Sequence, residues 1–63
     1  MDAEWEHLVI LTLKGITHDE AAAEELRGRM HEDLAIAYAD WKLGGETREN
    51  VAALIARMAE RYL

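Results

Sequence analysis

The stretch that decides the fold covers residues 17–45 and reads THDEAAAEELRGRMHEDLAIAYADWKLGG. Thr17, followed three residues later by Glu20, is typical of a capping box, in which two side chains satisfy backbone N–H groups at the start of a helix. Until the glycine pair that ends the stretch, only Gly28 interrupts the helical pattern. An isolated glycine costs about 1 kcal/mol and does not usually end a helix. The sequence therefore predicts one long helix over residues 18–43. A break at Gly28 is the alternative, and it would let four helices close into a compact monomer.

A shorter helix is expected on each side of the long one. The first covers residues 3–14, with Asp2 as its N-cap and Gly15 at the position where a left-handed residue ends a helix. A strand in this apolar segment is the alternative. The second covers residues 47–62 and begins at the cap residue Thr47. In both helices the apolar side chains sweep an arc of about 200°, roughly twice the width of the apolar stripe of a surface helix.

These three segments predict an all-α fold in a single domain, residues 1–63. Short loops force neighbouring helices to run antiparallel, so both short helices fold back onto the long one. Two short helices leave apolar surface bare, and we expect a second copy to cover it in a helical-bundle dimer. The side chains expected at an oligomer or partner interface are Trp5, Val9, Leu13, Met30, Leu34, Tyr38, Trp41, Leu54, Met58 and Tyr62.

The charge is distributed unevenly along the chain. The net charge is −6, and the acidic excess lies in the first 25 residues, where Lys14 is the one base. Direct nucleic-acid binding needs clustered Lys and Arg and is not expected here. An acidic surface suits a basic protein partner better. The expected acidic partner patch consists of Asp2, Glu4, Glu6, Asp19, Glu20 and Glu24. The simpler interpretation is a solvated face that Arg27 and Arg29 partly neutralise.

Residue types suited to catalysis or metal binding are scarce. The chain has no Cys and no Ser, the two commonest nucleophiles, and no glycine-rich phosphate loop. Glu4 and His7 have the Glu-x-x-His spacing of metal sites in helical bundles, but they lie on the polar side of the helix expected over residues 3–14. His18 and His31 are expected at the surface. We therefore expect no catalytic residue, no metal site and no cofactor.

The same properties narrow the function to a class. The apolar run at residues 8–11 is far shorter than the ~20 residues of a membrane span, and a cytoplasmic location is expected. The sequence is typical of a small non-enzymatic protein that binds another protein and regulates or inhibits it. Its usage of Ala and Arg over Lys hints at a bacterial or phage source. The alternatives are an assembly protein whose function is its own homo-oligomer, and a metal-binding helical bundle that uses Glu4 and His7.

Overall fold

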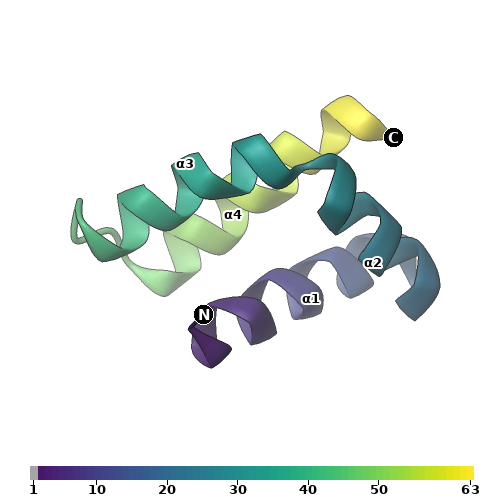
Figure 1. The fold of residues 1–63 in the computed structure, drawn as a ribbon, viewed down its shortest axis with the longest axis horizontal. Coiled ribbons are helices and arrows are strands. Elements are labelled where there is room, and N and C mark those ends of the chain that lie inside the picture. Colours follow the sequence, from purple (N-terminus) through teal and green to yellow (C-terminus); the bar gives the residue numbers. More distant parts are fainter. Residues whose placement is uncertain (1) are drawn as a thin grey trace.

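The computed structural model describes residues 2–63, which form four α-helices and a final 3₁₀ turn, without a strand in that range (Figure 1). The elements are α1 (Ala3–Thr17), α2 (Glu20–Arg29), α3 (His31–Lys42), α4 (Arg48–Ala59) and the 3₁₀ turn η1 (Glu60–Tyr62). α1 and α2 form one hairpin and α3 and α4 a second, and α1 also packs against α4. The predicted all-α fold is confirmed. The predicted three-helix arrangement is wrong, because residues 18–43 contain two helices instead of one.

The chain bends between α2 and α3 at Met30, two residues beyond the glycine considered as a breaking point. Met30 has φ −90° and ψ 12°, whereas Gly28 lies within α2. The N–H of Met30 donates to Leu26 O at 3.0 Å, and the N–H of Leu34 donates to Met30 O at 2.8 Å. Each helix therefore keeps its hydrogen bonds up to the bend. The Met30 side chain is fully buried there, and the bend turns the apolar sides of both helices toward one core.

The boundary between α1 and α2 lies later than the sequence predicts. α1 continues through Gly15 to Thr17 and ends at His18, which takes the left-handed conformation with φ 58°. Asp19 caps α2 by accepting a hydrogen bond at 3.0 Å from the N–H three residues on. The Thr17 hydroxyl instead donates to the carbonyl oxygen four residues earlier, at 2.9 Å. The predicted cap at Thr17 is thus wrong by two residues, because Asp19 is a stronger cap residue than threonine.

The other helix boundaries follow the sequence more closely. Asp2 caps α1, since its Oδ1 accepts from the N–H groups of Glu4 at 3.0 Å and Trp5 at 3.3 Å. Thr47 caps α4 by accepting from the N–H of residue 50 at 3.2 Å. The glycine pair makes the turn before it, and Gly45 has the positive φ of 71° that favours glycine.

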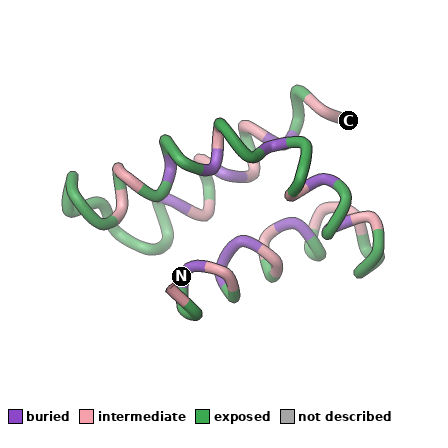
Figure 2. Tube along the Cα trace, viewed as in Figure 1, coloured by how far each residue is buried: buried purple, intermediate pink, exposed green. Residues whose placement is uncertain are grey.

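One apolar core lies between the four helices, where their buried sides meet (Figure 2). Its buried side chains are Trp5, Leu8, Val9, Leu13, Ala23, Leu26, Met30, Leu34, Ala37, Val51, Ile55 and Ala59. The Cα radius of gyration is 10.7 Å, against about 10.6 Å for a compact chain of this length. Most of the large apolar side chains in residues 2–63 are thus buried or partly buried within a single chain, although Leu11, Ile36, Leu43 and Leu63 stay exposed. The reason for expecting a dimer, a long helix that two short ones leave partly bare, does not apply to the bent chain.

Candidate functional site

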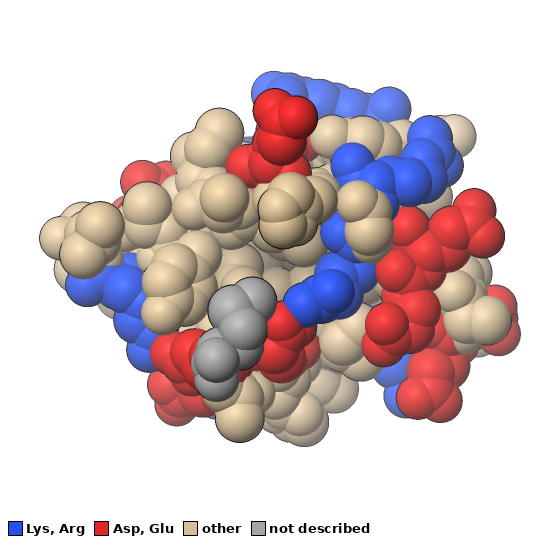
Figure 3. Space-filling model, viewed as in Figure 1, with Lys and Arg blue, Asp and Glu red and all other residues tan. Residues whose placement is uncertain are grey.

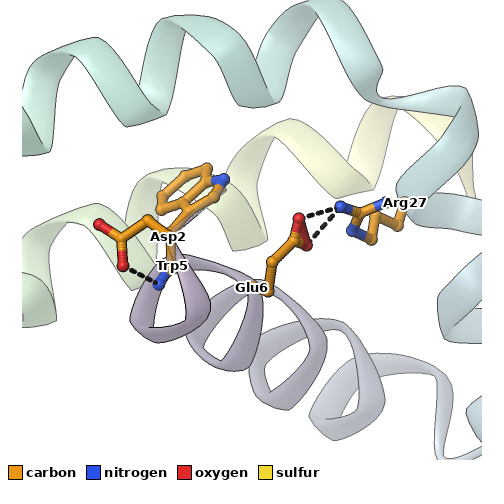
Figure 4. Close-up of polar contacts among 4 residues, drawn as sticks. All are labelled: Asp2, Trp5, Glu6 and Arg27. Carbon is orange, nitrogen blue, oxygen red and sulfur yellow. Dashed lines mark hydrogen bonds and ion pairs between the residues drawn. The ribbon is translucent and has the colours of Figure 1, made fainter.

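The acidic residues of α1 are paired within the molecule. Glu6 accepts hydrogen bonds from the guanidinium group of Arg27 on α2 (Figure 4), and Lys42 Nζ lies 3.0 Å from Asp2 Oδ2 and 3.6 Å from Glu4 Oε1. The hydrogen bond to Glu6 raises the pKa of Arg27. The bond between Asp2 and Lys42 raises the pKa of the lysine and lowers the pKa of the aspartate. These acids therefore tie α1 to α2 and to the end of α3.

The acidic residues of α2 lie at the surface. Asp19, Glu20 and Glu24 are all exposed, and Figure 3 shows acidic side chains gathered over α2 on one face of the molecule. The predicted acidic patch thus divides into a paired set on α1 and an exposed set on α2. Arg27 neutralises an acid of the paired set, as expected, through its ion pair with Glu6. Arg29 packs instead over the ring of Tyr62, with 5.6 Å between its guanidinium carbon and the ring centroid.

A groove opens between α1 and α3, with a cavity volume of about 280 Å³. It is lined by Asp2 and Trp5 from the start of the chain, by Arg27 from α2, and by His31, Leu34, Ala35 and Tyr38 from α3. The buried Trp5 and Leu34 form its floor, and the exposed Ala35 and Tyr38 form its α3 wall. We name this feature the α1–α3 groove. It is an apolar hollow with charged residues at its ends.

Trp5, in the floor of the α1–α3 groove, packs against two other aromatic rings. Tyr38 meets Trp5 edge to face with 5.1 Å between ring centroids, and Trp41 lies behind with its centroid 5.8 Å from that of Trp5. Figure 4 shows the nitrogen edge of the Trp5 indole directed toward Glu6 and Arg27. Trp5 is only 5% exposed. Within residues 2–63 no side-chain nitrogen is both buried and unpaired, and no hydrogen bond joins this N–H to another described residue, so the indole nitrogen keeps some exposed surface.

The predicted interface residues occupy three kinds of position. Those buried in the core of the single chain are Trp5, Val9, Leu13, Met30 and Leu34. Those packed against the core and partly buried are Trp41, Leu54, Met58 and Tyr62. Tyr38 is exposed, at 36%. The structure brings three of the ten together at the α1–α3 groove, namely Trp5, Leu34 and Tyr38. The others serve the packing of one chain on itself.

Tyr62 anchors the end of the chain on the second hairpin. Its hydroxyl donates to Asp33 Oδ2 on α3 at 2.8 Å, and this hydrogen bond raises the pKa of Tyr62. Arg29 covers the ring and donates to the Tyr62 carbonyl oxygen at 3.4 Å. The contacts explain why a residue predicted for an interface with another molecule lies half-buried against α2 and α3.

The histidines and the Glu-x-x-His pair do not form a cluster. Glu4 and His7 are exposed on α1, and Glu4 is directed to Lys42. His18 occupies the left-handed end of α1. Among residues 2–63, no group of three or more potential metal-ligating side chains comes together. His31 alone of the histidines lines the α1–α3 groove.

Sequence reasoning missed three lining residues of the groove: Arg27, His31 and Ala35. They follow one another at helical spacing, together with Tyr38, along one side of the segment from α2 into α3. That spacing could have shown that these residues share one side of the helices. It could not have shown that α1 lies across the groove from them, because this depends on the bend at Met30.

Comparisons with known protein families, with curated proteins and with solved structures give no match to this chain. None of the helices in residues 2–63 combines the length and apolarity that crossing a membrane requires. The geometry of the α1–α3 groove is therefore the main ground for a functional proposal.

Proposed function

We propose that this chain is a small, non-enzymatic protein-binding regulator or inhibitor, of the type found in bacteria and phages, and that it holds its partner at the α1–α3 groove. The observation that carries the proposal is the groove itself, a hollow of about 280 Å³ with a buried apolar floor and an aromatic wall. Apolar pockets that a partner covers and desolvates are where binding partners insert the side chains that dominate affinity.

The size of the groove suits a single inserted side chain. Its volume of about 280 Å³ is at the lower limit of the roughly 300–1,000 Å³ that small-molecule pockets occupy. One large apolar side chain fits such a space. The exposed wall of Ala35 and Tyr38 leaves room for the chain that carries it.

The charged groups at the groove support binding rather than catalysis. Arg27 is held by Glu6, and Asp2 is held by Lys42 as well as by the backbone at the start of α1. Ion pairs of this sort orient helices and fix charges. A general acid or base would need a pKa moved toward neutrality, whereas the pKa of Asp2 is lowered and that of Arg27 is raised.

The substitution Ala35→Arg tests the proposal, because it fills the groove without touching the buried core. Ala53→Arg, at an exposed position of α4, is the matched control. Tagged wild-type protein is used to capture a partner from a lysate of the source organism, and affinities for the purified partner are then measured by calorimetry. We expect wild type and Ala53→Arg to bind equally, and Ala35→Arg to bind at least about tenfold more weakly, since it blocks the burial of one apolar side chain. Equal binding by all three would contradict the proposal.

A second candidate is an assembly protein whose function is its own homo-oligomer. One observation favours it: Ile36, on the outer side of α3, is 57% exposed, and Leu43, the C-cap seven residues later, is 87% exposed. A second copy could cover this stripe in a dimer. The mass of the protein in solution distinguishes the two candidates.

A further inference from the structure

The groove also indicates the chemical class of the partner segment, an inference that rests on the proposed function. We propose that the occupant of the α1–α3 groove is a short basic segment of another protein. It inserts one branched apolar side chain between Trp5 and Tyr38, offers a carbonyl oxygen to the Trp5 indole N–H, and lays Lys or Arg side chains over the exposed acids of α2. Three separate observations carry these three contacts.

The apolar contact follows from the shape of the groove. Leu34 and Trp5 are buried below it, and Tyr38 stands at its side, edge to face with Trp5. Ala35 is the smallest residue of the α3 wall and keeps the entrance open. A branched side chain that enters here exchanges water for contact with a rigid aromatic and aliphatic surface, which is the main source of affinity at such pockets.

The hydrogen-bond contact follows from the Trp5 indole. Its nitrogen edge points toward Glu6 and toward Arg27, which lines the groove, and the N–H has no acceptor among the described residues. Any occupant that seals the groove also removes this N–H from water. A buried donor left without an acceptor is costly, so the occupant must bring an acceptor with its apolar group. A carbonyl oxygen of a peptide backbone is such an acceptor and lies next to every side chain.

The charged contact follows from the acids of α2. Glu20 and Glu24 share a side of the helix with Arg27 and lead along α2 to the groove, and both are exposed. Arg27 is already balanced by Glu6 and attracted by Glu24, so it adds little free positive charge. The chain as a whole carries a net charge of −6. A basic segment is therefore attracted to this end of the groove, and an acidic one is repelled.

Three synthetic peptides of equal length test the apolar contact and the charged contact. The first carries one leucine among lysines and alanines, the second replaces the leucine by alanine, and the third replaces the lysines by glutamates. Binding is measured by fluorescence anisotropy of labelled peptide at low and high salt. We expect the first peptide to bind about tenfold more tightly than either of the others, because each lacks one of the two attractive groups. Its affinity should also fall as salt rises.

Matched variants of the protein localise the binding. Glu20→Gln combined with Glu24→Gln should weaken the first peptide severalfold, whereas Glu49→Gln combined with Glu60→Gln, which changes the net charge equally at exposed positions of the second hairpin, should not. Ala35→Arg should abolish the leucine preference. In ¹H–¹⁵N spectra the indole signal of Trp5, assigned with the variant Trp41→Phe, should shift when the first peptide binds.

The outcomes separate this inference from the proposed function. If the captured partner depends on Ala35 but the glutamate peptide binds as well as the lysine peptide, the protein-binding function stands and the basic segment is wrong. Equal binding of the leucine and alanine peptides, an unmoved Trp5 indole signal, or no saturable binding of any peptide would also overturn the inference. If neither partner nor peptide responds to Ala35→Arg, both proposals fail.

Discussion

At the scale of single residues, His18 holds an unfavourable backbone conformation. It ends α1 with φ 58°, a region in which side chains with a Cβ atom are disfavoured by roughly 1–2 kcal/mol relative to glycine. We expect His18→Gly to raise the free energy of unfolding by about 0.5–1 kcal/mol, the remainder being lost to the greater freedom of glycine in the unfolded chain. Urea denaturation measures the change. His7→Gly, within α1, should lower stability by about 1 kcal/mol. A loss of stability in both variants would contradict the argument.

A second residue-scale prediction concerns Tyr62 and Asp33. The hydrogen bond from the hydroxyl to Asp33 raises the pKa of Tyr62 above its ordinary value of 10.0. The stability that this bond provides is complete below that ordinary value, and it is lost as the pH rises through the raised pKa, because the ionised tyrosine can no longer donate. In a Tyr38→Phe background, we expect Asp33→Asn to lower the pH at which the tyrosinate absorbance of Tyr62 appears. Asp40→Asn, an exposed acid on the same helix, should leave it unchanged.

At the scale of the elements, local signals predicted α1 and α4 and placed the start of each, but they joined α2 and α3 into one helix. Asp2, Thr47 and the glycine turn act as predicted, because capping depends on residues adjacent in sequence. The helix ends predicted at Gly15 and Thr17 were wrong, because both residues are tolerated inside a helix and the stronger cap residue Asp19 follows them. The bend at Met30 carries no local signal, because the residue is a good helix former. It is set by the burial of Met30 in a core that four helices share.

The glycines give a prediction at this scale. Gly15 and Gly28 lie within helices, and a Cβ atom at either position would meet nothing within 4 Å. We expect Gly15→Ala and Gly28→Ala each to stabilise the fold by about 0.5–1 kcal/mol, because alanine favours helix over glycine. Gly44→Ala places a Cβ atom 2.8 Å from the Asp40 carbonyl oxygen, and Gly45→Ala meets the positive φ of 71°. Both should destabilise by more than about 0.5 kcal/mol in thermal unfolding. Destabilisation by Gly28→Ala would show that the bend requires the glycine.

At the scale of the whole molecule, the acidic patch and the groove differ in how far the sequence determines them. The exposed acids of α2 follow from composition and helical periodicity. The pairing of Glu6 with Arg27 and of Asp2 with Lys42 was only partly foreseen, because it depends on which helices meet. The groove could not be predicted from the sequence. It joins Trp5 to Ala35 and Tyr38 across thirty residues of chain, and only the bend at Met30 sets α1 opposite α3.

The bend also decides what to expect of self-association. One chain buries or partly buries most of its large apolar side chains and is as compact as a folded chain of this length, and the exposed apolar stripe of Ile36 and Leu43 is narrow and bordered by Glu32 and Asp40. Stable interfaces bury about 800 Å² on each partner, far more than two side chains supply. We therefore expect light scattering coupled to gel filtration to give the mass of a single chain, 7.2 kDa, at micromolar concentration. Twice that mass, returned to the single-chain value by Ile36→Lys, would restore the dimer and favour the homo-oligomer as the function.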